Sequence, residues 1–494
     1  MLLNANELPN KLWAAVVPFL KGPQVAPIDR LPNDLLAEVF MHTLCFNGFG
    51  SATERSRLPL EPLTVSHVSR RWRNTALSHS ALWSTIWLDR PRLAHLHMLE
   101  LWLERSQSAK LVIYLRQAPP NSQFSDPNEY ELTEQILNRL RAELHRWYRI
   151  TLFFAHGTQN ALLLLPQDRA AAPLLSHVHL ATNELWDRPS RIQAETTLHS
   201  YASVKSLVVH PSTLQIHTEW NNLSELDTNQ VGSPVANYMA VLKLCRSLTR
   251  AEFRIVPDRP DAPFVRPSLR VGLPKLASLT LHLDHTDAGP LFDCLVLPVL
   301  QNLVLRYARS PRRSNDPNAL RLLLARSGPS CILKRFSLQD NPRIRDPNAA
   351  YHLAFLHSPQ MAGLIELFLQ VDLCDAVLRF LTLGNAEDGT PRNLPDLLVL
   401  SLSDLKGDHL EDLELYRMVV SRLGAGQSLR EAYFKLCLKG HSDSRVLPLL
   451  FERCRERIEL KVYLATCEDA HSKTGWYKSA PIPGGYLTDA LLLL

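Results

Sequence analysis

Three pairs of histidines have a spacing that metal ligands can have: His95 with His97, His177 with His179, and His282 with His285. Residues at positions i and i+2 of a strand point to the same side, so one pair could supply two ligands. A zinc site needs three or four protein ligands, and no further Cys, His or carboxylate recurs at a fixed spacing from these pairs. We interpret the histidines as surface residues and expect no metal.

The sequence lacks the common catalytic and nucleotide-binding motifs. It contains no Gly-x-Ser-x-Gly, no Walker loop, no Gly-x-Gly-x-x-Gly and no His-Glu-x-x-His. Gly424 and Gly426 lie close together, but they are predicted to end a helix over residues 413–423. Glycine is scarce, with 18 residues against 34 prolines, which disfavours loops that hold phosphates. We expect no enzymatic activity and no cofactor.

Cysteine usage and hydropathy indicate the compartment. The eight cysteines form no Cys-x-x-Cys pair and lie scattered, mostly in apolar runs, so we interpret them as reduced, small hydrophobic residues. The apolar run over residues 12–20 is too short to span a bilayer and is broken by Pro18. The expectation is an intracellular protein, cytoplasmic and/or nuclear, with no membrane partner.

Charge changes sign between two neighbouring stretches. Residues 306–345 contain ten Lys/Arg against two Asp, a balance of +8, and residues 366–415 contain eleven Asp/Glu against three Lys/Arg, a balance of −8. Both can be solvated outer faces. Alternatively, because arginine suits bidentate contacts with carboxylates or phosphates, the basic stretch binds an acidic or phosphorylated protein target. The candidate target-binding residues are Arg312, Arg313, Arg335, Arg343 and Arg345.

The elements that position these charges come from one recurring phrase, Leu-x-x-Leu-x-Leu. Its ten copies, some with other apolar residues, begin at positions 147, 175, 204, 248, 276, 300, 333, 364, 397 and 429, and a partial copy begins at 223. Each copy predicts a short strand whose alternate residues are buried, and helical stretches such as 317–326 and 375–381 lie between. This is typical of leucine-rich repeats, with parallel strands on the concave side and helices outside.

The predicted core of these strands consists of the apolar residues at the fourth and sixth positions of the phrase. They include Leu279, Leu281, Leu303, Leu305, Phe336, Leu338, Leu367, Leu369, Leu400 and Leu402. A last strand is predicted over residues 458–464. The overall fold class is therefore α/β, with a helical N-terminal part that the phrase does not reach.

That N-terminal part contains two amphipathic segments. Pro32 suits the first turn of a helix, and apolar residues follow it at helical spacing up to Phe40. In the second segment Val65, Val68 and Trp72 form one stripe of a single predicted helix, with arginines beside it.

These segments resemble the F-box. The matching residues run from Leu31-Pro32-Asn33-Asp34-Leu35-Leu36 to Val39-Phe40, then Val68-Ser69-Arg70-Arg71-Trp72-Arg73, then Leu82-Trp83. The stretch 101–106, Leu-Trp-Leu-Glu-Arg-Ser, is similar to a segment that follows the F-box in large fungal families. The resemblance covers residues 28–115. It departs from the family at Ser69, where Cys is usual, and in the long loop over 47–62.

The resemblance implies docking on the Skp adaptor of a cullin–RING ubiquitin ligase, with the rest of the chain holding a protein substrate. The positions carried over as adaptor-binding are Leu31, Pro32, Leu35, Val39, Phe40, Val68 and Trp72. Two alternatives stay open. One is an F-box scaffold for protein–protein interaction without ubiquitination, and the other is a repeat protein that binds an anionic partner. A net charge of +5 over 494 residues does not by itself indicate nucleic acid.

The domain organisation predicted from these observations has five parts. They are an N-terminal segment and linker (1–27), an F-box-like helical domain (28–90), a connecting region (91–145), the repeat array (146–465) and a C-terminal tail or cap (466–494).

Overall fold

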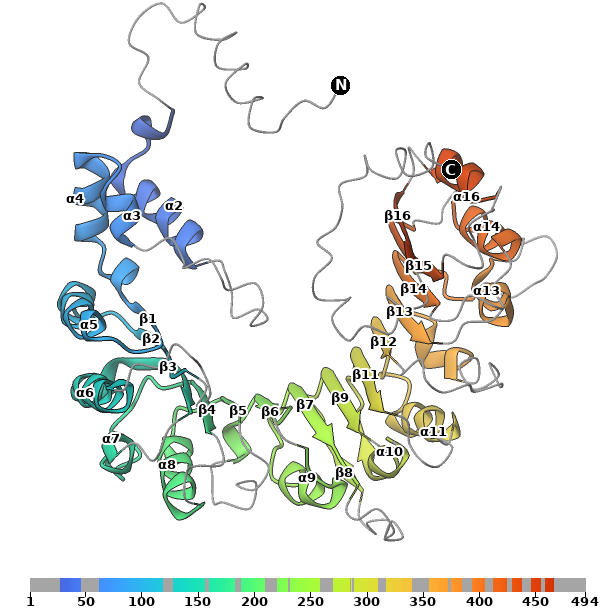
Figure 1. Ribbon diagram of the computed structural model, residues 1–494. Helices are drawn as coiled ribbons and strands as arrows, with labels where there is room; N and C mark the ends of the chain where they lie inside the picture. Colours follow the sequence, from blue (N-terminus) through green and yellow to red (C-terminus); the bar gives the residue numbers. More distant parts are fainter. Residues whose placement is uncertain are drawn as a thin grey trace, which may run out of the picture.

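A single parallel sheet runs through the protein. The computed structural model describes residues 27–45, 62–118, 128–155, 160–182, 188–208, 220–229, 232–257, 270–284, 286, 288–309, 317–339, 355–371, 375–383, 393–404, 412–423, 429–437, 446–454 and 458–465. Within them fourteen strands form one sheet whose order follows the chain. The sheet lines the inside of an arc and the helices cover its outside (Figure 1). The predicted α/β class with parallel strands is confirmed, and the arrangement is solenoid-like.

The strands of this sheet are β1 (Thr85–Asp89), β2 (Leu111–Arg116), β3 (Trp147–Phe154), β4 (His177–Thr182), β5 (Ser206–Val208), β6 (Glu225–Asp227), β7 (Arg250–Ile255), β9 (Ser278–Asp284), β11 (Asn302–Arg309), β12 (Arg335–Gln339), β13 (Glu366–Val371), β14 (Val399–Asp404), β15 (Glu431–Cys437) and β16 (Glu459–Ala465). A separate pair is formed by β8 (Val271–Gly272) and β10 (Leu295–Val296). Every predicted copy of the phrase, the partial one included, forms a strand.

The α-helices are α2 (Asn33–Cys45), α3 (Pro62–Ser66), α4 (Arg70–Ser78), α5 (Leu93–Ser106), α6 (Glu129–Ala142), α7 (Asn160–Leu163), α8 (Arg188–Ser200), α9 (Val235–Leu242), α10 (Gly289–Cys294), α11 (Pro317–Ser327), α13 (Asp375–Leu381), α14 (Asp412–Ser421) and α16 (Val446–Cys454). The short 3-10 helices are η2 (Pro27–Arg30), η3 (Ser80–Trp83), η4 (Leu144–Arg146), η6 (Trp220–Asn222) and η7 (Pro359–Met361). None of these described helices is long and apolar enough to cross a membrane.

Period-two alternation explains the sheet. The fourth residue of each phrase is buried and stands in register with the fourth residue of the next phrase, so that Phe336 lies between Leu303 and Leu367. The sixth residues of successive copies form a second buried row in the same way, with Leu338 between Leu305 and Leu369. All ten residues predicted for the core are at most 4% exposed, which confirms the prediction.

The sheet begins earlier in the chain than predicted. Strands β1 and β2 pair in parallel and continue the sheet toward the N-terminus, within residues assigned to the helical domain and the connecting region. The phrase is present there with its first position changed: Trp83-x-x-Ile86-x-Leu88 parallels Trp147-x-x-Ile150-x-Leu152. Each Trp indole N–H donates to a carbonyl seven residues earlier, at 2.8 Å and 2.9 Å. Because the copy beginning at Trp147 was recognised with the same residue at its first position, the same search extended toward the N-terminus would have found β1.

The predicted role of the cysteines holds for the four whose side chains are described. Cys245, Cys294, Cys331 and Cys454 are buried, and none of them forms a disulfide with another described residue. Burial raises the pKa of Cys245 to about 12 and that of Cys331 and Cys454 to about 11, so these thiols behave as small apolar groups. Cys45, Cys374, Cys437 and Cys467 lie outside the described side chains.

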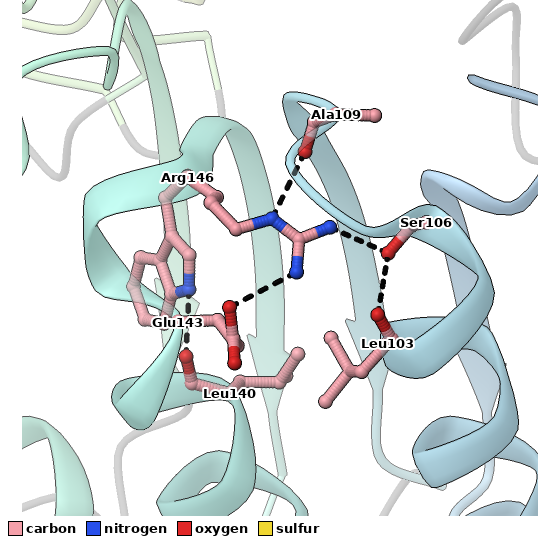
Figure 2. A network of polar contacts seen from close by, with 7 residues as sticks. Leu103, Ser106, Ala109, Leu140, Glu143 and Arg146 are labelled. Atoms are coloured by element: carbon pink, nitrogen blue, oxygen red, sulfur yellow. Dashed lines mark hydrogen bonds and ion pairs between the residues drawn. The ribbon is translucent and has the colours of Figure 1, made fainter. Parts of the chain in front are cut away.

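Arginines near the ends of helices connect one unit to the unit before it. Arg146 is 5% exposed and donates to the Ala109 carbonyl (3.1 Å), the Ser106 hydroxyl (2.5 Å) and the Glu143 carboxylate (2.9 Å), as Figure 2 shows. Arg422 repeats this arrangement one repeat before the C-terminal end. Its guanidinium is 1% exposed and donates to three backbone carbonyls, those of Leu381 (2.7 Å), Leu394 (3.0 Å) and Asn393 (3.0 Å).

Replacing Arg422 by Met should lower the free energy of unfolding by about 1.5–3 kcal/mol. The apolar side chain keeps most of the volume but leaves the three carbonyls without their donor. The matched control is Arg417→Met on the same helix, because Arg417 is exposed and forms a surface ion pair with Glu414. Urea unfolding followed by circular dichroism measures both. Equal stability of the two variants would contradict the role assigned to Arg422.

Candidate functional site

The first candidate site is formed by the N-terminal helices. Helix α2 begins where Pro32 accepts a hydrogen bond from the Leu36 N–H (2.9 Å). Its inner stripe, Leu36 and Phe40, is at most 1% exposed, and the Phe40 ring lies 4.9 Å from that of Trp72 on α4. The other stripe faces outward, with Leu35 53% and Val39 38% exposed. Exposed apolar side chains are typical of an interaction surface where several of them adjoin.

The second predicted helix is in fact two helices. Helix α3 ends at Ser66 and α4 begins at Arg70, and the Ser69 hydroxyl accepts a hydrogen bond from the Trp72 N–H (3.1 Å) at the new N-terminus. Serine is a favoured N-cap because its hydroxyl satisfies an otherwise unpaired N–H of the first turn. The break separates Val65, which is buried, from Val68, which is 60% exposed. The predicted single stripe is therefore wrong.

Arg71 ties the two helical segments together at this surface. Its guanidinium donates to the Asn33 side-chain oxygen (3.1 Å) and to the Leu31 carbonyl, both at the beginning of α2. The contact spans 38 to 40 residues of sequence, so it fixes the start of α2 against α4. The outward-facing apolar residues of both segments consequently belong to one module.

The residues carried over as adaptor-binding divide into three groups. Pro32, Leu35, Val39 and Val68 are exposed, and Leu31 and Trp72 are partly exposed. Phe40 is 1% exposed and belongs to the core, so the expectation of a surface role for Phe40 needs correction. Its place in the motif is explained by packing against Trp72, which orients the helices.

The remaining motif residues meet at the junction between the helices and the sheet. Trp83 is fully buried, and its ring lies 4.9 Å from that of Trp102 on α5, edge to face. The Arg105 guanidinium lies over the Trp83 ring at 4.2 Å. Ser106, also fully buried, accepts from Arg146 (Figure 2). The segment Leu82-Trp83 and the segment 101–106, about 20 residues apart in the sequence, therefore pack against each other.

The basic stretch is only partly described. Arg312, Arg313, Arg343 and Arg345 lie outside the described residues, and Arg335 is the one of the five candidates that lies within them. Arg335 stands in register with Glu366 on the next strand and forms an ion pair with it. Its guanidinium is therefore already engaged by the first residue of the acidic stretch, and at this position the two opposite charges neutralise each other.

A second candidate site lies on the inner face of the sheet, where the residues between the buried positions point. A hollow of about 390 Å³ crosses β3 to β6. The polar or aromatic side chains that line it include Arg149, Phe153, His177, His179, Glu225 and Asp227. Registers place Arg149 beside His177, and Ser206 between His177 and Glu225.

Both histidines of the pair 177/179 face this hollow, on the side predicted for them. Burial and the Arg149 charge lower the pKa of His177. Among the described residues no group of three or more His, Cys, Asp or Glu could hold a metal ion. Sequence reasoning missed Arg149, Glu225 and Asp227, although aligning the copies of the phrase by position would have placed Arg149, His177 and Glu225 in one row.

Comparison with known proteins adds little. No family model and no curated protein matches the chain. Among solved structures, the chain is similar to the crystal structure of a protein from Bacteroides fragilis, a structural genomics target. The identity is 11%, the match covers 73% of this chain and 76% of that chain, and the TM-score is 0.29. A likeness this weak supports no argument on fold or function.

Proposed function

We propose that the protein is the substrate-recognition subunit of a Skp–cullin–F-box type ubiquitin ligase. In this proposal the N-terminal helices are an F-box that docks on the Skp adaptor, and the leucine-rich repeats hold a protein target. The protein itself catalyses nothing. It acts by proximity, because a stiff repeat array keeps the target near the enzyme that transfers ubiquitin.

The observation that carries the proposal is the exposed apolar surface of the N-terminal module. Leu35 and Val39 on α2 and Val68 in the turn between α3 and α4 are 38–60% exposed. Burying such side chains against a partner favours binding, and a few central residues usually contribute most of the affinity. The order of the motif residues along the chain, together with the packing of Trp83 on Trp102, is consistent with an F-box followed directly by the repeats.

Replacing Leu35 and Val68 together by Ala should weaken binding of a purified Skp-type adaptor by about 2 kcal/mol, roughly 30-fold, as measured by isothermal titration calorimetry. Both side chains are exposed, so the variant should keep the thermal stability of the wild type. Leu77→Ala is the matched control, because Leu77 is a 40% exposed leucine of α4 outside the motif. Unchanged affinity in the double variant would refute the docking surface, and absence of binding by the wild-type protein would refute the F-box.

A further inference from the structure

The inner face of the first four strands carries a row of aromatic rings. Trp87 on β1 stacks on Tyr114 of β2, with ring centroids 3.7 Å apart and planes within 5°. Tyr114 lies 5.7 Å from Phe153 on β3, and Phe153 lies 4.7 Å from His179 on β4. Trp87, Phe153 and His179 are each partly exposed. Cross-strand aromatic pairs of this kind stabilise the sheet, and the exposed parts of the rings also offer a partner the side-chain type in which interfaces are enriched.

The row leads into the hollow over β3 to β6, where the side chains change from aromatic to acidic. Phe153 and His179 form part of the hollow's wall, and Glu225 and Asp227 line its far side. Glu225 accepts from the Ser206 hydroxyl (2.9 Å), and Asp227 accepts from the Asn229 N–H (2.8 Å). These two hydrogen bonds hold the carboxylates in place without neutralising them, because both donors are uncharged.

The charges around the hollow favour a cation. Burial raises the pKa of Asp227 to about 6, and the neighbouring Glu252 acts in the same direction. The Glu252 carboxylate already contacts His282, with Oε1 and Nε2 2.8 Å apart. On the other side of the hollow, the lowered pKa of His177 favours its neutral form. Among the lining residues Arg149 is the one permanent cation against two carboxylates, and outside the lining Arg250 on β7 stands in register with Glu225. A positive group entering beside Asp227 would relieve this excess of negative charge.

We propose that the hollow takes a Lys or Arg side chain of a partner protein while the aromatic row takes an apolar or aromatic side chain next to it in the partner's sequence. An aromatic wall beside carboxylates is a suitable environment for an ammonium or guanidinium group, since the ring faces attract cations and the carboxylates pair with them. The inference rests on the proposed function only in calling this partner the target. It moves the target surface from the basic stretch 306–345 to the opposite half of the sheet and reverses the charge of the target.

The test uses a library of random 12-residue peptides displayed on phage, selected on the full-length wild-type protein. The enriched peptides should share a Lys or Arg next to an apolar or aromatic residue. A synthetic peptide with that consensus should bind Asp227→Asn about tenfold more weakly or worse. Asn keeps the oxygen that accepts from the Asn229 N–H, so the loop should stay in place. Glu366→Gln is the matched control, a carboxylate on the same face at β13, and should bind as the wild type does.

The dependence of binding on pH provides a second readout. Because the cation favours ionised Asp227, affinity should fall roughly fourfold between pH 7.5 and pH 5.5, as a pKa of about 6 requires. Asp227→Asn should lose the part of this dependence that comes from the Asp227 carboxylate, and the histidines around the hollow remain in the variant. The other charged or titratable groups around Asp227 are Glu225 on the same strand, Arg250 and Glu252 on β7, and His282 on β9. Across the hollow they are Arg149 on β3 and His177 and His179 on β4, and all of these groups are unchanged in the variant.

Several outcomes would overturn the proposal. They are an absence of enriched peptides, a consensus without Lys or Arg, an acidic consensus, or equal binding of the basic peptide by Asp227→Asn. Tighter binding of a labelled single-stranded RNA than of the peptide would also overturn it, because aromatic rows bind bases as well. Adaptor binding is measured separately through the Leu35 and Val68 variant, so failure of the F-box proposal leaves the peptide result readable, and the reverse also holds.

Discussion

Replacing Trp83 by Ala should lower the free energy of unfolding by about 3–5 kcal/mol, the range for deletion of a large aromatic side chain from a core. Trp83 is fully buried at the junction between the N-terminal helices and the sheet. The substitution removes its edge-to-face contact with Trp102, the stacked Arg105 guanidinium and the donor to the Ala76 carbonyl. Ala76, itself fully buried on α4, then keeps a carbonyl without a partner, which adds to the cost of the cavity.

Urea unfolding should show this loss, and hydrogen exchange should locate it. Protection should fall first in α4, η3 and β1, which meet at Trp83. Trp87→Ala is the control, because Trp87 lies four residues further on and is partly exposed on the inner face of the sheet. It should cost less than Trp83→Ala. If the two variants lost the same stability, the burial assigned to Trp83 would not be what holds this junction together.

Replacing Leu367 by Ala should cost about 2–5 kcal/mol. Leu367 is fully buried on β13, in register with Phe336 on one side and Leu400 on the other. In an array where each unit contacts only its neighbours, the damage should spread from β13 to the strands beside it before it reaches distant ones. Hydrogen exchange followed by mass spectrometry should therefore show lost protection centred on β12 to β14, with β1 to β4 close to wild type.

Leu322→Ala provides the control for this prediction, since Leu322 is a 47% exposed leucine on α11 and should change stability by much less. Uniform loss of protection from β1 to β16 in the Leu367 variant would mean that the sheet unfolds as one cooperative core. The unit-by-unit account of stability would then be refuted.

Several features of this protein could be read directly from the residues. The Leu-x-x-Leu-x-Leu phrase predicted its strands because alternation with period two is local and the buried residues are all aliphatic or aromatic. The helix beginning at Pro32 was predictable for the same reason, since Pro and the helical spacing of Leu35, Leu36 and Phe40 lie within ten residues. The missed strands β1 and β2 followed the same alternation. Trp83 at the first position of the β1 copy matches Trp147 of a recognised copy, whereas the β2 copy has Lys110 there.

Helix α2 has two apolar stripes, and helical spacing in the sequence does not decide which of them is buried. Leu31, Leu35 and Val39 form one stripe and Leu36 with Phe40 another, at equally good spacing. Packing against Trp72 of α4 places the second stripe inside and leaves Leu35 and Val39 outside. A stripe is buried only if another element covers it, and that element comes some 30 residues later. The break at Ser69 has a local cause instead, because the Ser69 hydroxyl caps α4 by accepting a hydrogen bond from the Trp72 N–H.

The sequence by itself determined the units: where the strands lie, which residues fill the core and that the chain repeats. The tertiary structure alone decided which polar residues become neighbours. Arg335 pairs with Glu366, and Asp227 comes to share a hollow with Phe153 and His177, although 50 or more residues separate it from either. Stacking of the units is responsible, because the register of a parallel sheet brings equivalent positions of successive units about 5 Å apart, whatever the length of the chain between them.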